Sequence, residues 1–165
     1  MAIGSVLTNT FKEELLQSGH NFNASGDTPA GDAFKIALYS ATTANIGTTT
    51  TVYTAPADGT ADPTNTLEVT STGSGYTTGG NALTNTGTDK STVTAYTDFS
   101  DTSWTSASFT ARGCMIYNTD VLSGFTTNRS VCTIDFGGDK TVSSGTFTIQ
   151  FPANDSSNAI IRITS

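Results

Sequence analysis

The stretch Phe34-Lys35-Ile36-Ala37-Leu38-Tyr39 predicts a β-strand, because its large apolar side chains recur at every second position. Phe34, Ile36 and Leu38 then point to one face of a sheet. Other strand-like runs are bounded by Gly, Asn, Asp or Ser. They bring the expected strands to seven, the further six being Leu67 to Thr70, Thr92 to Phe99, Phe109 to Tyr117, Ser130 to Phe136, Thr146 to Phe151 and Ala159 to Ile163.

The composition of the 165-residue chain indicates a mainly β protein with a single core. Thr, with 34 residues, and Ser, with 18, supply much of a chain in which only 13% of the residues are charged. A disordered chain normally combines low hydrophobicity with high net charge, whereas this chain has few charges of either sign, nine Phe and five Tyr. We therefore expect the chain to fold.

Two long connections separate the expected strands. The first, Ser40 to Thr66, contains a run of Thr and two Pro, and the second, Ser71 to Lys90, is rich in Gly. No helical pattern lies between the strands, which excludes a parallel α/β sheet and favours a two-layer antiparallel sandwich, jelly-roll-like in form. We assign residues 23–165 to this sandwich and residues 1–22 to an N-terminal helix or arm.

The N-terminal segment carries the one convincing helix pattern. Thr10 and Glu13 fit a capping box at its start, and Gly19 is placed to end it in a left-handed conformation. A helix this short is marginal alone, so its apolar stripe must be buried on the domain or on a partner. That stripe is the candidate protein interface and consists of Leu7, Phe11 and Leu15.

The charge pattern disfavours several classes of partner. The net charge is −7, and nucleic-acid binding needs clustered cations. The chain has no apolar run long enough for a membrane span and no basic leader followed by an apolar run. We expect no cofactor, no metal, no nucleic acid and no membrane partner. The basic residues are scattered singly, at Lys12, Lys35, Lys90, Arg112, Arg129, Lys140 and Arg162.

Groups suited to catalysis are sparse. His20, the single His, is expected to interact with the carbonyl end of the helix or to pack at the turn, which disfavours a Ser and His hydrolase. Asp101-Thr102-Ser103 resembles an aspartic protease loop, whose chemistry needs two carboxylates that share a proton. The sequence holds no second copy of this motif, so only a homodimer could supply the second carboxylate. Asp98 and Asp101 are also oxygen ligands for calcium in principle, but the EF-hand spacing is absent. We favour a solvated turn ahead of a buried Trp104.

Arg112 interrupts an apolar strand pattern. A guanidinium in that position needs a carboxylate or several carbonyl partners. Structural pairing with Asp135 on a neighbouring strand is therefore favoured over ligand binding. The strand that carries Asp135 is expected to end at a turn formed by Gly137 and Gly138.

The two cysteines, Cys114 and Cys132, are 18 residues apart, which is not a metal-binding spacing. Both lie in apolar, strand-like runs, so the favoured interpretation is a pair of buried thiols that act as small hydrophobes. A disulfide remains an alternative, because a hairpin centred near Ser123 places the two residues opposite each other.

A set of short motifs, each weak alone but specific together, extends over nearly the whole chain. They are Phe11-Lys12-Glu13-Glu14-Leu15-Leu16 with His20-Asn21-Phe22, Phe34 to Tyr39, Gly75-Tyr76-Thr77-Thr78-Gly79-Gly80, Asp101-Thr102-Ser103-Trp104, Thr110-Ala111-Arg112-Gly113, Ile116-Tyr117-Asn118, Asp135-Phe136-Gly137-Gly138-Asp139-Lys140, Phe147 to Pro152 and Asn158 to Ile163. This set resembles a family of small structural proteins of tailed bacteriophages, particularly phages of marine and freshwater bacteria.

The resemblance implies a component of the virion, assembled in the cytoplasm of a bacterial host. Our leading hypothesis is a non-enzymatic capsid decoration or cement protein that binds the major capsid protein or other virion proteins, as a homo-oligomer with a trimer favoured. The sandwich would be the rigid body, and the helical N-terminus or the long loops the docking surface. The alternative is a tail, collar or fibre-attachment protein. A small carbohydrate-active or proteolytic enzyme would rest only on scattered Asp residues.

Overall fold

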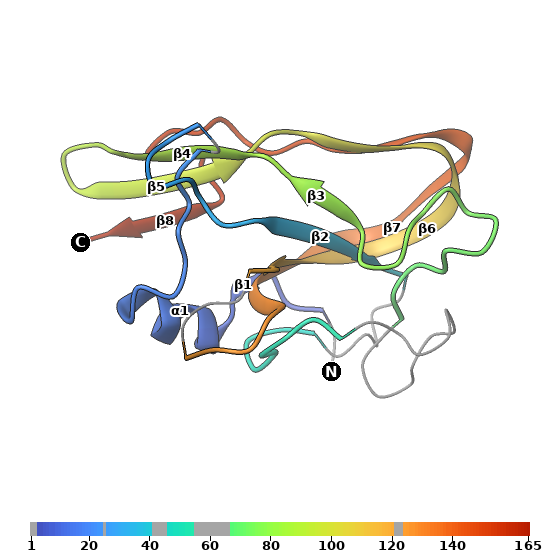
Figure 1. Ribbon diagram of the computed structural model, residues 1–165. Helices are drawn as coiled ribbons and strands as arrows, with labels where there is room; N and C mark the ends of the chain where they lie inside the picture. Colours follow the sequence, from blue (N-terminus) through green and yellow to red (C-terminus); the bar gives the residue numbers. More distant parts are fainter. Residues whose placement is uncertain (1–2, 25, 41–45, 55–66, 121–123) are drawn as a thin grey trace.

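A computed structural model describes residues 3–24, 26–40, 46–54, 67–120 and 124–165 (Figure 1). Within these ranges the chain forms one short helix near its N-terminus and two antiparallel sheets, which confirms the expected fold class. The elements are β1 (Val6–Leu7), α1 (Asn9–Leu16), β2 (Phe34–Tyr39), β3 (Asn81–Leu83), β4 (Asn85–Lys90), β5 (Thr94–Phe99), β6 (Thr102–Asn118), β7 (Arg129–Ile149) and β8 (Ile161–Thr164).

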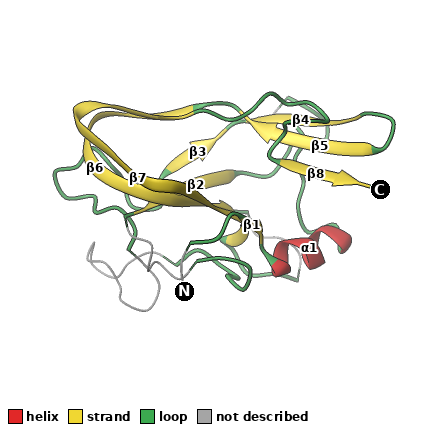
Figure 2. Cartoon of the chain, turned by 180° about the vertical axis from the view of Figure 1, so that it is seen from behind, coloured by secondary structure: helices red, strands yellow, loops and turns green. Residues whose placement is uncertain are grey.

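The strands are divided five and three between the sheets. The larger sheet has the order β1-β7-β6-β2-β3, and the smaller sheet has the order β4-β5-β8. Figures 1 and 2 show the smaller sheet at the same end of the molecule as α1.

β6 and β7 form a long hairpin that passes from one layer of the sandwich to the other. Its pairing runs from Asn118–Arg129 at the hairpin end to Thr102–Ile149 at the open end. Figure 1 shows the two strands running together along the lower layer, turning upwards and returning along the top. A register shift between Ala111 and Gly113 and a positive φ of 72° at Gly137 interrupt the regular ladder near the bend. This folded ribbon therefore supplies part of both layers.

The strand predicted from Phe34 to Tyr39 is confirmed as β2 with those bounds. The strands expected at Ser130 to Phe136 and Thr146 to Phe151 instead belong largely to one strand, β7. The predicted turn at Gly137 and Gly138 is wrong, because Gly137 uses its positive φ to form an irregular position inside the ladder.

The long connection expected from Ser71 to Lys90 contains β3 and β4, whose few apolar residues give little alternation in the sequence. The strand expected from Leu67 to Thr70 contributes a single bridge, between Glu68 and Tyr39. The connection expected from Ser40 to Thr66 lies mostly outside the described residues.

α1 has different caps from those predicted. Its N-cap is Thr8, whose hydroxyl accepts a hydrogen bond from the Phe11 amide at 3.3 Å, so the capping box predicted at Thr10 is wrong. The left-handed residue after the helix is Ser18, with φ 60°, in place of the expected Gly19.

The main core joins the N-terminal segment to the sandwich. Phe11 and Phe22 are buried in one cluster with Phe34 of β2 and Phe99 of β5, and the rings of Phe22 and Phe34 stack with centroids 4.6 Å apart. The boundary expected between residues 22 and 23 falls inside this cluster, so the N-terminal segment and the sandwich share one core.

A second buried cluster covers the opposite face of β2. Phe34, Ile36 and Leu38 belong to the main cluster, whereas Ala37 and Tyr39 pack in the second one. The alternation in the sequence therefore separates two buried faces, with Lys35 the only half-buried residue of the strand.

Candidate functional site

The stripe predicted as a protein interface lies mainly against the chain's own sandwich. Phe11 is fully buried, with its ring centroid 5.0 Å from that of His20. Leu7 and Leu15 are partly buried against the same core. The prediction of an interface at Phe11 is therefore corrected, because this side chain already has an intramolecular partner.

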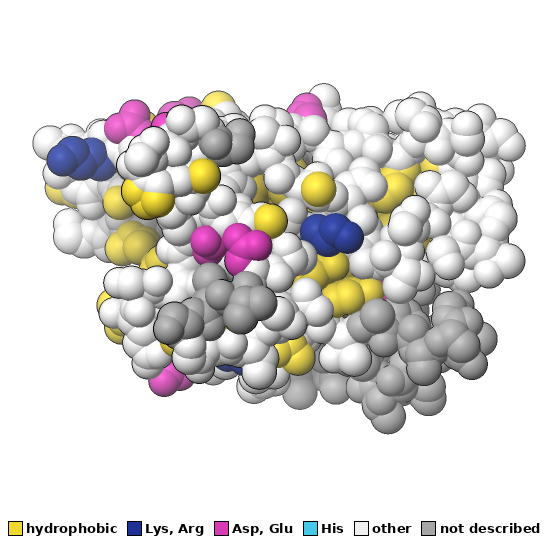
Figure 3. Space-filling view, viewed as in Figure 1, with side chains coloured by type: hydrophobic (Ala, Val, Ile, Leu, Met, Phe, Trp, Pro, Cys, Tyr) yellow, Lys and Arg dark blue, Asp and Glu magenta, His cyan; other side chains and the backbone are white. Residues whose placement is uncertain are grey.

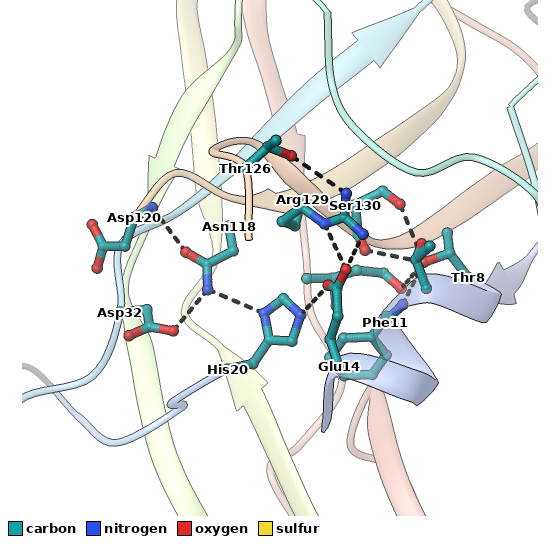
Figure 4. A network of polar contacts seen from close by, with 12 residues as sticks. Thr8, Phe11, Glu14, His20, Asp32, Asn118, Asp120, Thr126, Arg129 and Ser130 are labelled. Carbon is teal, nitrogen blue, oxygen red and sulfur yellow. Dashed lines mark hydrogen bonds and ion pairs between the residues drawn. The ribbon is translucent and has the colours of Figure 1, made fainter. Parts of the chain in front are cut away.

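Glu14 belongs to α1, and both oxygens of its buried carboxylate are bound by other residues (Figure 4). Arg129, at the start of β7, donates to Oε1 through Nε and Nη2. His20 Nε2 lies 2.9 Å from Oε2. The Glu14 side chain is only 2% exposed and that of Arg129 16%. A carboxylate this far from water needs a charged partner, and Arg129 supplies it across 115 residues of sequence.

The partners of His20 define its tautomer. Nε2 faces a carboxylate oxygen of Glu14, and Nδ1 lies 3.1 Å from the donating amide nitrogen of Asn118. Nε2 therefore carries the proton and Nδ1 accepts, as in a neutral imidazole. Burial lowers the pKa of His20 below its ordinary value of 6.5, although Glu14 opposes this shift. His20 thus packs at the turn after α1, the second of its two expected roles, with a carboxylate as partner.

Asn118, at the end of β6, extends this network to a third part of the chain. Its amide nitrogen donates to Asp32 Oδ2 at 2.7 Å, and its side-chain oxygen accepts from the Asp120 amide at 2.9 Å. Asp32 Oδ2 also accepts from the Asn21 amide at 2.8 Å. The network therefore fastens the helix, the turn after it and both strands of the long hairpin together.

Glu68 is a second buried carboxylate, 4% exposed, with a different set of partners. Its Oε1 accepts from Tyr76 Oη and from the Gly79 amide, each at 2.7 Å, and its Oε2 accepts from Tyr53 Oη at 2.9 Å. Burial raises the pKa of Glu68 above its ordinary value of 4.5, while the three donors and the more distant charge of Lys35 act in the opposite direction.

The backbone of Gly79 completes the Glu68 cluster. The Gly79 amide binds Glu68, and its carbonyl accepts from Tyr117 Oη at 2.8 Å. Gly79 has φ 87°, and a Cβ there would stand 3.1 Å from the Tyr117 oxygen, so the position favours glycine. Tyr117 stacks on Tyr53 with ring centroids 4.3 Å apart. The cluster is a packed polar core whose hydroxyls already have partners.

Sequence reasoning did not single out Glu14 or Glu68. The available signal for Glu14 is its position three residues after Phe11, on the apolar side of the helix. The available signal for Glu68 is its place between Leu67 and Val69 in an apolar run.

The pairing predicted for Arg112 is confirmed. Arg112 Nε donates to Asp135 Oδ1 at 2.9 Å, and this guanidinium holds the pKa of Asp135 below its usual value of 3.8. Trp104 is buried, 3% exposed, with its ring centroid 6.0 Å from that of Phe147. These three residues have structural roles in the folded ribbon.

Asp98 and Asp101 bind backbone amides of the chain. Asp98 is buried and accepts from the amides of Phe99 and Ile160 at 2.8 and 3.1 Å. Asp101 is exposed and accepts from the Phe151 amide at 2.9 Å. The expected solvated turn therefore describes Asp101 but is wrong for Asp98.

Both cysteines are free, buried thiols, as the favoured interpretation predicted. In the ladder Cys114 is opposite Ile134, and Cys132 is opposite Ile116, so the two cysteines are not direct partners. Burial raises the pKa of Cys132 to about 12, which keeps its thiol protonated and unreactive.

The sandwich is open along one side, between the two halves of β7. A hollow of about 580 Å³ is lined mainly by apolar side chains, and an adjoining hollow of about 440 Å³ continues past Ile160 to Leu7 and Cys132. We call this region the apolar seam. Its large apolar residues are partly buried and comprise Leu7, Ile134, Phe136, Phe147, Ile149, Phe151 and Ile160.

The face of the molecule seen in Figure 3 is formed largely by backbone and neutral polar side chains, with hydrophobic patches and a few charged side chains scattered over it. Among the described residues, no group of three or more His, Cys, Asp or Glu is arranged to hold a metal ion. No helix in the same ranges is long and apolar enough to cross a membrane. Comparison of the chain with protein-family models, with curated proteins and with solved structures finds no match.

Proposed function

We propose that this chain is a non-enzymatic structural protein of a tailed-phage particle, a decoration or cement subunit on the outer surface of the head. The observation that carries the proposal is the apolar seam. Large, partly exposed apolar side chains gathered along one open side of a sandwich are typical of a surface that another protein covers. The partner class is the major capsid protein or another virion protein, together with further copies of the chain.

The motifs that resemble phage structural proteins support this proposal through the contacts they make. Several of their polar residues bind other parts of the same chain. The motif residues therefore stabilise the fold, which favours a structural protein that binds other proteins over an enzyme. The motif residues with such internal contacts include Glu14, His20, Gly79, Arg112, Asn118 and Asp135.

The buried carboxylates give further support to a non-enzymatic role. Glu14, Glu68 and Asp98 each have both oxygens bound by donors of the same chain. A general acid or base must reach a substrate proton, and these groups are turned inwards. Their bonds instead stiffen the sandwich behind the seam.

Cross-linking mass spectrometry of purified particles that contain this chain tests the proposal. We expect cross-links to the major capsid protein and a copy number in the hundreds. Cross-links to tail, collar or fibre proteins alone, with only a few copies per particle, would contradict the decoration role. Absence of the chain from the particle would contradict a virion role altogether.

A pair of variants connects this test to the seam. Phe151→Glu places a charge among the apolar side chains of the seam and should lower the copy number about tenfold, equivalent to about 1.4 kcal/mol of binding. Thr105→Glu places the same charge on an exposed position of β6 and should leave the copy number unchanged. Equal incorporation of both variants would exclude the seam as the docking surface.

A further inference from the structure

The free edges of the two sheets are protected, with one exception. β1 and β3 are only two and three residues long. β4 carries Asp89 and Lys90 and has a register shift after Asn85, and β8 is four residues long and carries Arg162. Short length, charge and irregular pairing are the devices by which soluble β proteins prevent edge-to-edge association. Within the described ranges, β6 also has no second strand beside it over Thr102–Arg112, but register shifts interrupt that edge, and Ser74 and Asn81 bind its Ser108 amide and Ser103 carbonyl.

The exception is the outer edge of β7. In the described part of the chain, β1 pairs with β7 only at Cys132 and Thr133, and from Ile134 to Ile149 the strand has β6 as its single neighbour. Residues 141–151 contain no charged residue and no proline. An extended, uncharged edge of this length invites pairing with another strand.

The end of this edge is regular and lies beside the larger hollow. The register shifts between the pairs Trp104–Phe147 and Ala107–Gly145, and the extra residue there belongs to β6. β7 therefore has no bulge between Gly145 and Ile149. Phe147 and Ile149 point towards the seam and, with Phe136 and Phe151, line the 580 Å³ hollow. A strand added to this edge would therefore also cover the apolar side chains beneath it.

We propose that the occupant of this edge is a second copy of the chain, paired β7 to β7 in antiparallel fashion around a two-fold axis at Phe147. In this register Phe147 faces its own counterpart, Thr146 faces the partner's Thr148, and Gly145 faces the partner's Ile149. Aromatic pairs and Thr pairs stabilise neighbouring antiparallel strands. No like charges meet, although the chain as a whole carries −7.

The segment is complementary to itself, which is why a second copy is favoured over an unrelated strand. An isologous contact needs one surface that is extended, uncharged and matched about its own centre, and Gly145–Ile149 meets all three conditions. The inference deepens the proposed function, because it names what covers the larger hollow of the seam. It gives a two-fold dimer in place of the trimer expected from the sequence.

Sedimentation velocity on the full chain tests this pairing. We expect the wild-type protein to form dimers. The double variant Thr146→Lys with Thr148→Lys should be monomeric, because each introduced lysine then faces a lysine of the partner subunit. The matched control is Thr92→Lys with Thr105→Lys, which adds the same charges at exposed positions outside the free edge of β7 and should still dimerise.

A mixing experiment identifies the partner as a second copy. The double variant Thr146→Glu with Thr148→Glu should also be monomeric alone. Mixed in equal amounts with the lysine double variant, it should form heterodimers, since lysines then face glutamates across the axis. Circular dichroism checks that each variant is folded. Hydrogen exchange of wild-type protein provides a readout without mutation, because amide protection over residues 145–149 should rise with protein concentration.

Three results would overturn the inference: a wild-type monomer at every concentration, a trimer, or a dimer that survives the lysine double variant. None of them would decide the proposed function, since cross-links to the capsid and the copy number are measured independently. Conversely, a dimer in solution with no chain in the particle would leave the pairing intact and contradict the virion role.

Discussion

Two buried glutamates, Glu14 and Glu68, are held by different kinds of partner. Glu14 binds the guanidinium of Arg129 and the imidazole N–H of His20, whereas Glu68 binds two phenol hydroxyls and one backbone amide. The ion pair joins residues 115 apart in sequence. The donors of Glu68 are at most 15 residues away. The Glu14 carboxylate therefore connects segments that are distant in sequence, whereas the Glu68 carboxylate connects neighbouring loops.

This difference in partners implies a difference in sensitivity. Breaking a buried ion pair leaves a charge without compensation, which costs several kcal/mol. Removing one of several neutral donors leaves the others in place, which costs about 1 kcal/mol. The contrast between the two sites can be tested in order of expected effect.

The largest effect should follow from Arg129→Met, which leaves Glu14 buried with only His20 as partner. We expect a loss of about 3–5 kcal/mol in the free energy of unfolding, measured by urea denaturation at neutral pH. Lys12→Met, at an exposed position of α1, is the control and should change stability by less than about 0.5 kcal/mol. A loss below about 1 kcal/mol for Arg129→Met would mean that water replaces the guanidinium beside Glu14. The Glu14 site would then be no more sensitive than the Glu68 site.

Glu68→Gln should have a smaller effect, because the shape is kept and the lost charge had no direct cationic contact. One amide oxygen then replaces two acceptors while three donors remain, so we expect a loss of about 1–3 kcal/mol in the same denaturation experiment. Glu13→Gln, on the exposed side of α1, serves as the control. If Glu68→Gln and Arg129→Met lower the free energy of unfolding equally, the neutral donors of Glu68 contribute as much as the ion pair of Glu14. That result would contradict the proposed difference between the two sites.

Tyr53→Phe removes one donor of Glu68 and keeps the ring that stacks on Tyr117. The expected loss is about 0.5–1.5 kcal/mol in thermal or chemical unfolding. Tyr96→Phe, whose hydroxyl has a longer contact of 3.3 Å to the surface residue Asp89, should cost less. Equal losses for the two variants would show that Glu68 does not depend on this hydroxyl.

The smallest effect should be a difference in pH dependence between the two sites. The lowered pKa of His20 means that its contribution to stability is complete above 6.5 and is lost as the pH falls through the folded-state pKa. The raised pKa of Glu68 has the opposite sign, so its contribution is complete below 4.5 and is lost as the pH rises through the folded-state pKa. Unfolding curves of His20→Gln and Glu68→Gln across this range should differ from wild type with opposite slopes. Slopes of the same sign would contradict one of the two assignments.

The sequence was sufficient where a residue's own neighbours determine its environment. The alternation around Ile36 predicts β2 with its bounds, and an isolated guanidinium in an apolar strand predicts the pairing of Arg112 with Asp135. Both predictions rest on strong local rules: the two-residue period of a strand and the cost of burying a charge.

The remainder depends on contacts between distant segments. Glu14 resembles a surface residue of a polar helix until Arg129 and His20 are placed beside it. Thr8, and not Thr10, caps the helix, and the Thr8 hydroxyl also donates to the Ser130 carbonyl at 3.0 Å in the folded protein. Tertiary contacts of this kind override local propensity, and a single sequence gives no direct signal for them.

The separation of Glu14 from Arg129 also bears on synthesis of the chain. The helix leaves the ribosome well before its cationic partner, which is translated 115 residues later. At about 5–20 residues per second, that delay is on the order of ten seconds. During this interval the helix has neither its ion pair nor β7, the strand on which it docks, so it must wait for β7 before it can join the native core.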